Sequence, residues 1–107
     1  MEKRKEAIDR LRTMLRKKEI TVLREGESDS GDKTEEILLN MLLKVNVHRI
    51  DKIYPRDDIE ELLEEISNGA DSPFVFVGDR YIGGLSQVQK MKENGLLEVI
   101  ARDVKKI

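Results

Sequence analysis

The sequence of 107 residues contains no cysteine and only one histidine, His48. Without cysteine, the chain has no disulfide bond, no thiolate nucleophile and no cysteine ligands for zinc or an iron–sulfur cluster. A single histidine is too few for an ordinary transition-metal site built from imidazole nitrogens. We therefore expect a protein without thiol chemistry and without a bound metal.

The sequence also lacks long apolar runs and an excess of one charge. No apolar stretch approaches the length needed to span a bilayer, and the charged N-terminus lacks the apolar segment of a secretory signal. The 20 Lys and Arg residues nearly balance the 22 Asp and Glu residues, so the formal net charge is −2. This balance gives no long-range attraction to nucleic acid or to an acidic membrane. We expect a cytoplasmic protein that binds neither.

The pattern of residues 72–84 predicts a β-hairpin around which the rest of the chain is organised. β-Branched and aromatic residues at 74–77 predict a buried strand. A Gly-Asp pair then predicts a turn, and a second apolar run follows it. Gly83 and Gly84 end the second strand. Pro73 stands at the head of the first strand, where a proline is tolerated because that residue need not donate a ladder hydrogen bond.

Hydrophobic periodicity predicts the other elements. In chain order they are a helix at 2–18, a strand at 20–23, a polar loop at 25–32, a helix at 34–44, a strand at 45–50 with Val45 and Val47 facing the core, a helix at 59–66 capped by Asp57 or Asp58, the hairpin, a helix at 86–93 and a further turn at 96–100. The right-handed crossover rule makes the first two strands parallel and covers both sheet faces with helices. The strand at 74–77 lacks alternation, which is typical of a central strand.

The N-terminal segment, residues 1–18, has two interpretations beside the domain expected at 19–107. The apolar positions Ile8, Leu11 and Leu15 lie at helical spacing, which predicts an amphipathic helix docked on its own domain. The same spacing spans about two heptads of a coiled-coil seam, which would make residues 2–18 a homodimerisation helix.

The hairpin and the segment after it resemble the C-terminal half of a glutaredoxin. The resemblance is carried by the order proline, strand, Gly-Asp turn, Ile-Gly-Gly and, further on, Asn-Gly-Leu-Leu at residues 94–97. It extends over about residues 19–102 and is weak before Pro73. It implies an α/β fold of the thioredoxin/glutaredoxin type, a four-stranded mixed sheet flanked by helices, here with an extra N-terminal helix. It also implies a cis peptide bond before Pro73.

Glutaredoxins carry their redox site after the first strand, as Cys-x-x-Cys or Cys-x-x-Ser, with the reactive sulfur at a helix N-terminus that lowers its pKa. The resemblance places the degenerate counterpart of this site at Ser28, Asp29, Ser30 and Gly31. A serine hydroxyl cannot replace the thiolate, because its pKa is far too high and the loop offers no general base. The loop holds four acidic residues, and Lys33 is the only cation expected nearby. That field would raise a thiol pKa and repel anions.

The resemblance also implies a groove that holds glutathione in the active members of the family. Its residues here are Ser72, Pro73, Gly83, Gly84, Ser86 and Gln87. Backbone amides at a helix start can accept a carboxylate, but the acidic loop disfavours an anion. We interpret the chain as a redox-inactive glutaredoxin-like domain, a pseudoenzyme that acts as a protein-interaction or regulatory module. The alternatives are a glutathione-binding sensor or non-thiol transferase, and an assembly element that dimerises through residues 2–18.

Overall fold

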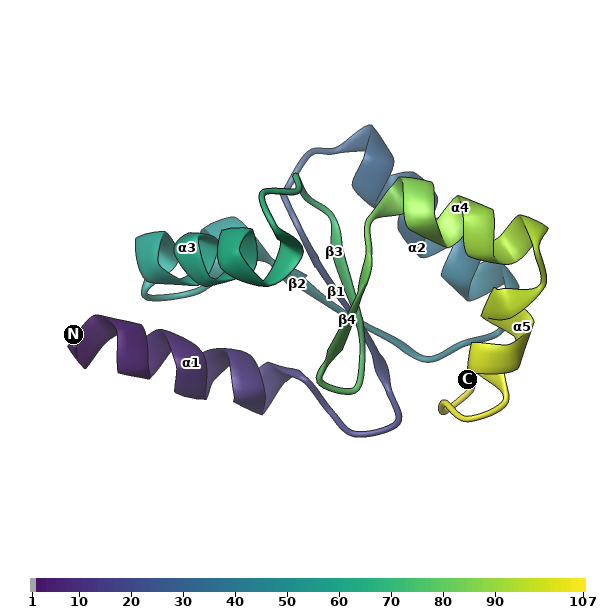
Figure 1. Ribbon diagram of the computed structural model, residues 1–107, viewed down its shortest axis with the longest axis horizontal. Coiled ribbons are helices and arrows are strands. Elements are labelled where there is room, and N and C mark those ends of the chain that lie inside the picture. Colours follow the sequence, from purple (N-terminus) through teal and green to yellow (C-terminus); the bar gives the residue numbers. More distant parts are fainter. Residues whose placement is uncertain (1) are drawn as a thin grey trace.

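The fold is a four-stranded sheet with helices on both faces (Figure 1). The computed structural model describes residues 2–107. Its elements are α1 (Glu2–Met14), β1 (Ile20–Arg24), α2 (Asp29–Asn40), β2 (Val45–Arg49), the 3-10 helix η1 (Ile50–Lys52), α3 (Arg56–Ser67), β3 (Phe74–Val77), β4 (Arg80–Gly83), α4 (Leu85–Glu93) and α5 (Leu96–Ala101).

The sheet is mixed, with the strand order β2-β1-β3-β4. β1 and β2 run parallel, whereas β1 pairs antiparallel with β3, and β3 antiparallel with β4. The parallel pairing of the first two strands and the central place of β3 are therefore confirmed. Phe76, in the middle of β3, is only 1% exposed, as expected for a strand covered on both faces.

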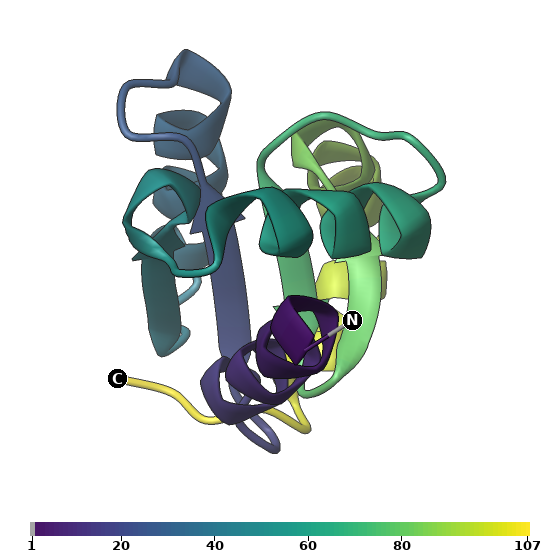
Figure 2. The same cartoon turned by 90° about the vertical axis from the view of Figure 1, so that its left-hand side faces the viewer.

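The two faces of the sheet carry two separate hydrophobic cores. On one face, α1 and α3 pack over Leu23, Phe74 and Phe76. On the other face, α2, α4 and α5 pack over Ile20, Val22 and Val75 (Figures 1 and 2). Alternate residues of one strand point to opposite faces, so β1 and β3 supply both cores.

The expected hairpin is confirmed. β3 and β4 are joined by a tight turn at Gly78, whose φ of 58° lies in the left-handed region that favours glycine. Tyr81 of β4 packs edge-on against Phe76 with 5.6 Å between the ring centroids. This geometry is favourable for aromatic pairs and ties the hairpin to the α1–α3 core.

Helix α1 is docked on the domain. It ends at Met14, earlier than residue 18, and it buries Ala7, Leu11 and Met14 in the core that it shares with α3. Arg4 adds an exposed ion pair to Glu65 of α3, at 2.7 Å. The docked interpretation therefore accounts for the apolar face of the helix. Met1 lies outside the described residues, and the division into 1–18 and 19–107 stays a prediction.

Two sequence expectations about element bounds are wrong. α2 begins at Asp29 rather than at Thr34, so half of the expected polar loop is helical. α3 begins at Arg56 after Pro55, which places Asp57 and Asp58 in the first turn rather than at the cap. The helix dipole favours acidic residues in the first turn as well as at the cap. The sequence pattern therefore could not tell which of the two positions Asp57 and Asp58 occupy.

The expectation that Val47 faces the core is also wrong. Val47 is 39% exposed, because β2 is the edge strand and lies beyond the cover of α2. The strand itself and its parallel register with β1 are as expected. Alternation alone could not show that this strand stands at the margin of the sheet.

Candidate functional site

Ser28 stands at the N-terminus of α2 and caps the helix. Its backbone is extended, and its Oγ accepts a hydrogen bond of 3.1 Å from the backbone N–H of Gly31. The Ser30 hydroxyl lies 3.1 Å from the same Oγ. Asp29 and Asp32 fill the first turn, where acidic residues favour the helix dipole. The hydroxyl at this position is therefore engaged in holding the helix start.

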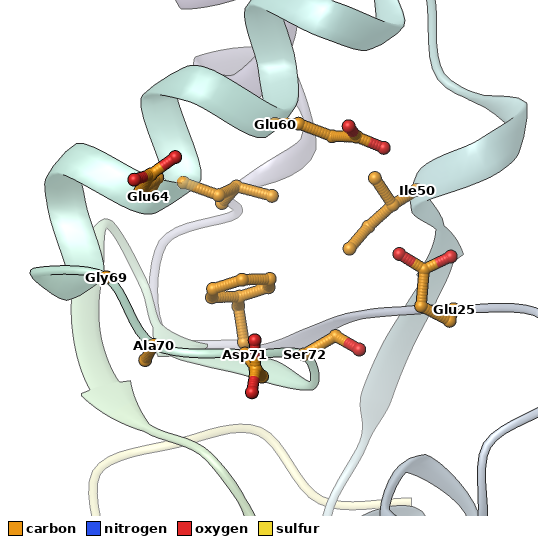
Figure 3. Close-up of a pocket in the computed structure, with 10 residues that line it drawn as sticks. Glu25, Ile50, Glu60, Glu64, Gly69, Ala70, Asp71 and Ser72 are labelled. Carbon is orange, nitrogen blue, oxygen red and sulfur yellow. The ribbon is translucent and has the colours of Figure 1, made fainter.

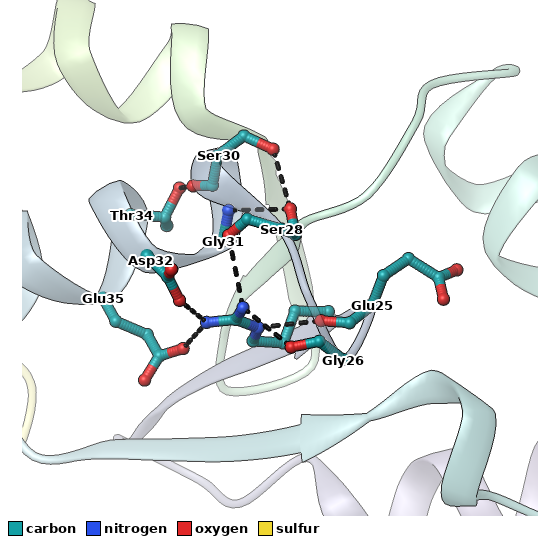
Figure 4. Close-up of polar contacts among 9 residues, drawn as sticks. Glu25, Gly26, Ser28, Ser30, Gly31, Asp32, Thr34 and Glu35 are labelled. Carbon is teal, nitrogen blue, oxygen red and sulfur yellow. Dashed lines mark hydrogen bonds and ion pairs between the residues drawn. The ribbon is translucent and has the colours of Figure 1, made fainter.

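Arg24, at the end of β1, lies beneath this helix start and is 7% exposed. Its Nε donates to the Glu25 carbonyl at 2.9 Å, and its Nη2 donates to the carbonyls of Gly26 and Ser28 at 3.1 and 3.2 Å. A guanidinium has five N–H donors in a planar fork. Three of these donors hold the loop between β1 and α2 (Figure 4).

The remaining Arg24 donors, on Nη1, meet two carboxylates of α2. Asp32 accepts at 2.7 Å, and Glu35 accepts on the same nitrogen. These two hydrogen bonds raise the pKa of Arg24 above its usual value, and the hydrogen bond to Glu35 has the larger effect. The cation is thus paired inside the protein, and all five of its donors have partners.

The expectation that Lys33 is the only cation near the loop is wrong, because Arg24 lies closer and is buried. The sequence pattern of the loop does not include Arg24, which lies at the end of the preceding strand. The glycines of the loop were the available indication that a large side chain lies against it. A Cβ at Gly31 would come within 2.9 Å of the Arg24 guanidinium carbon, and a Cβ at Gly26 would overlap the guanidinium of Arg49. Both glycines leave space for an arginine side chain.

Gly83 and Gly84 are required by the fold around the start of α4. Gly83 has a φ of 128°, and a Cβ there would come within 2.5 Å of the Gln87 Cβ. A Cβ at Gly84 would lie 3.0 Å from the carbonyl oxygen of Pro73. Gln87 folds back so that its Oε1 accepts the N–H of Gly84 at 2.9 Å. The amide at this helix start is therefore already paired within the chain.

The predicted site residues divide into separate clusters. Ser28, Ser30 and Gly31 meet at the start of α2, whereas Pro73, Gly84 and Gln87 meet at the start of α4. Ser86 and Asp29 are exposed. Ser72 belongs to neither cluster; it precedes the cis peptide bond to Pro73 and lines a pocket of its own.

This pocket is a cavity of about 350 Å³ between α3 and the segment that leads into β3. Its apolar residues are Ile50, Leu63 and Phe74, and its polar rim consists of Glu25, Glu60, Glu64, Asp71 and Ser72. Figure 3 shows the carboxylates of Glu25 and Glu60 on the same side of the cavity. Arg56 pairs with Glu60 at 3.0 Å, which leaves Glu25, Glu64 and Asp71 without an ion pair among the described residues. These three carboxylates around one opening favour a cationic group and oppose an anionic one.

Among residues 2–107, no group of three or more His, Asp or Glu side chains is arranged to hold a metal ion. None of the described helices is both long and apolar enough to cross a membrane.

The strand order, the helices on both faces and the hairpin define the glutaredoxin type of the thioredoxin fold. A structural comparison agrees: a buckwheat glutaredoxin, solved as a complex with glutathione, superposes with a TM-score of 0.87 over 96% of both chains, at 17% sequence identity. A reduced glutaredoxin C1 from Populus tremula x tremuloides gives a TM-score of 0.85 over 95% of this chain and 87% of that one, at 16% identity. At these identities the likeness shows the fold.

Sequence comparison is less extensive. No family model matches the chain. An uncharacterised protein from Arabidopsis thaliana is 39% identical over 51 residues, which are 45% of this chain and 13% of that protein. The chain thus aligns with only a small part of that relative. What is established is a glutaredoxin fold in a chain that has no cysteine.

Proposed function

We propose that this domain is a redox-inactive module that binds a partner protein through the pocket beside Ser72. The observation that carries the proposal is the state of Ser28. The resemblance to glutaredoxins assigns the thiolate position to Ser28 or a neighbour, and here the Ser28 hydroxyl caps α2 and accepts a hydrogen bond from the Gly31 amide. A capping hydroxyl is neither acidic enough nor free enough to act as a nucleophile.

Arg24 supports the same proposal. A cation under the helix start would activate a nucleophile or receive an anionic ligand if its donors were free. Here every donor has an internal acceptor, and Asp32 and Glu35 neutralise the charge. The cluster fixes the loop between β1 and α2, so it supports a structural role in place of a catalytic one.

The pocket beside Ser72 favours a basic partner segment. Glu25, Glu60, Glu64 and Asp71 surround it, and its apolar residues include Leu63 and Phe74. An extended segment with Lys or Arg side chains would place its charges at the rim and its aliphatic stems on the apolar surface. The acidic rim disfavours glutathione, which carries two carboxylates, and the Gly84 amide that would receive one of them is paired with Gln87.

The proposal can be tested by following backbone amide shifts in two titrations. One uses a basic peptide, Ala-Lys-Ala-Lys-Ala-Lys-Ala, and the other uses reduced glutathione. We expect the peptide to shift the amides of Asp71 and Ser72, and glutathione to leave Ser72, Gly84 and Ser86 unmoved at millimolar concentration. Shifts at those three residues with glutathione would instead support the sensor or transferase.

A charge reversal in the pocket rim sharpens the test. Glu60→Lys should weaken binding of the basic peptide, whereas Glu36→Lys, an exposed position on α2 with the same charge change, should not. In parallel, a mixed-disulfide reduction assay should give no turnover with the cysteine-free chain. Turnover near that of an active glutaredoxin would refute the pseudoenzyme.

A further inference from the structure

Strand β2 forms one margin of the sheet. It pairs with β1 along one side over all five residues, and within residues 2–107 no strand pairs with its other side. In Figure 2, β2 stands at the margin of the sheet, away from the β3–β4 hairpin. The unpaired backbone groups of an edge strand are a template for a further strand.

β2 is a short strand and carries one charged residue, Arg49, at its end, but it lacks the bulge, proline and lysine by which many edge strands avoid pairing. The other edge strand, β4, carries a register irregularity opposite Val75 and Phe76 and ends at Gly83. β2 has an uninterrupted register, contains no proline or lysine, and exposes the β-branched Val47 by 39%. Bulges, prolines and lysines are the common means of blocking edge pairing. The structure therefore protects one edge and leaves the other regular.

A groove of about 410 Å³ runs between β2 and the C-terminal end of α1. It is lined by Thr13, Met14, Arg16 and four residues of β2, 45–48. Arg16 and Arg10 act on His48, whose pKa is lowered first by burial and then by these two charges. The nearby Glu19 carboxylate is already paired with Asn46, Lys44 and Lys105. The groove therefore presents net positive charge beside an open strand.

We propose that the free edge of β2 binds an extended acidic segment of a partner protein as a fifth strand. Side chains of an added strand alternate between the two faces. Acidic side chains would lie over the groove near Arg16 and His48, and apolar ones would lie beside Val47 on the other face. A second copy of this chain fits less well, since it would bring its own Arg10 and Arg16 to the same place, and like charges oppose pairing.

The β2 edge would be a second binding surface of the interaction module proposed above. That its partner is a protein rests on the proposed function. The surface lies apart from the pocket at Ser72 and has the opposite charge. Substitutions at one surface should leave binding at the other unchanged. The two binding proposals can therefore be tested and rejected separately.

The probe is the peptide Thr-Glu-Val-Glu-Val-Glu-Thr, with Thr-Lys-Val-Lys-Val-Lys-Thr as its charge-reversed control. We expect the acidic peptide to shift the amides of residues 45–49 and to slow their hydrogen exchange, because an added strand pairs with the free backbone groups. Binding should weaken as salt is raised, since exposed charges are screened. The lysine peptide should leave residues 45–49 unmoved.

Two pairs of variants test the charge and the edge separately. Arg16→Glu should weaken binding of the acidic peptide by about fivefold or more, because attraction becomes repulsion at an exposed site; Lys5→Glu, far along the same helix, should not. Val47→Ser should weaken pairing without a change of charge, because it removes the β-branched apolar side chain beside the added strand, while Val99→Ser on α5 should have no effect. Val47 and Val99 are 39% and 50% exposed.

The inference is overturned if the acidic peptide leaves residues 45–49 unmoved, or if Arg16→Glu binds it like the unmodified chain. It is also overturned if the chain alone sediments as a dimer that Val47→Ser dissociates, because the edge then belongs to a second copy. Binding of the basic peptide at Ser72 should not respond to Arg16→Glu, because the two surfaces share no residues. A loss at both surfaces would show that the substitution does not act through the charge of the β2 groove, and it would overturn the inference.

Discussion

The Nδ2 atom of Asn46 in β2 donates a hydrogen bond of 2.9 Å to the buried carboxylate of Glu19, which directly precedes β1. Lys105 Nζ lies 3.2 Å and Lys44 Nζ 3.4 Å from the same carboxylate. The Lys105 backbone N–H in turn donates to the Lys18 carbonyl at 2.8 Å. One carboxylate therefore joins the start of the sheet, its edge strand and the C-terminal segment.

These contacts predict an acid-sensitive fold. The hydrogen bond from Asn46, aided by Lys105 and Lys44 and opposed by burial, lowers the pKa of Glu19 from 4.5 to about 2. Because the folded state favours the charged form, this contribution to stability is complete above pH 4.5 and is lost as the pH falls toward 2. Urea unfolding between pH 2 and pH 6 measures the effect.

Glu19→Gln should flatten this pH dependence and lower the urea midpoint at pH 6. Glu36→Gln, at an exposed position of α2, is the control and should leave the curve unchanged. An unaltered slope in Glu19→Gln would mean that other carboxylates carry the acid sensitivity.

Arg24 should be essential for the conformation of the loop before α2. Arg24→Lys keeps the charge, but an ammonium has three donors and no fork, so it cannot serve the three carbonyls and two carboxylates together. We expect a loss of about 2 kcal/mol or more in the free energy of unfolding, with faster amide exchange at residues 26–31. Denaturant titration and hydrogen exchange measure the two effects.

Arg80→Lys is the matched control, because Arg80 is an exposed arginine at the start of β4. Its change in stability should stay within about 0.5 kcal/mol. Equal effects of the two substitutions would show that the Arg24 contacts do not hold the loop.

The hairpin could be predicted from the sequence because its signals are local. Phe74 to Val77 form an apolar run next to a Gly-Asp turn, and the turn alone sets the pairing of β3 with β4. The start of α2 could not be predicted in the same way. Gly31 and the polar residues around Ser28 suggested a loop, yet Gly31 is helical and lies against the Arg24 guanidinium, which comes from outside that segment.

The candidate site shows the same limit. The resemblance assigned Ser28 to the degenerate site, but the sequence pattern put it in a loop ahead of a helix at residue 34, whereas Ser28 caps α2. The role of Arg24 depends on contacts with Asp32 and Glu35 across that loop. The exposure of Val47 depends on which strand stands at the margin of the sheet. Both are tertiary relationships, and no periodicity within a single segment contains them.

Leu11 should be a core residue of the monomer. It is 6% exposed and packs with α3 and the hairpin, so Leu11→Ala should cost about 2–5 kcal/mol in the free energy of unfolding. Thermal or urea unfolding measures this loss. Lys5→Ala, on the exposed side of α1, should change stability by less than about 0.5 kcal/mol.

Sedimentation of the same variants tests the assembly alternative, in which residues 2–18 form a dimer. If the unmodified chain sediments as a dimer and Leu11→Ala yields a folded monomer of unchanged stability, α1 is an assembly helix. A stability loss without a change in sedimentation supports the docked helix.

Restoring sulfur at residue 28 should not restore a fast thiolate. Ser28→Cys places a thiol at a helix N-terminus, which favours the anion, but Asp29 and Asp32 occupy the same turn and the Arg24 charge is already paired. We expect the thiol pKa to stay at or above about 8.5, the ordinary value. The pH dependence of iodoacetamide alkylation measures it.

Ser86→Cys provides the matched comparison, because residue 86 also lies in the first turn of a helix, α4, and that turn contains no acidic residue. The helix dipole then acts without nearby carboxylates, so its thiol pKa should lie below that of Ser28→Cys. The reverse order would show that the start of α2 still favours a thiolate. The domain would then lack only its sulfur atom, and the acidic residues around Ser28 would have no part in its loss of redox chemistry.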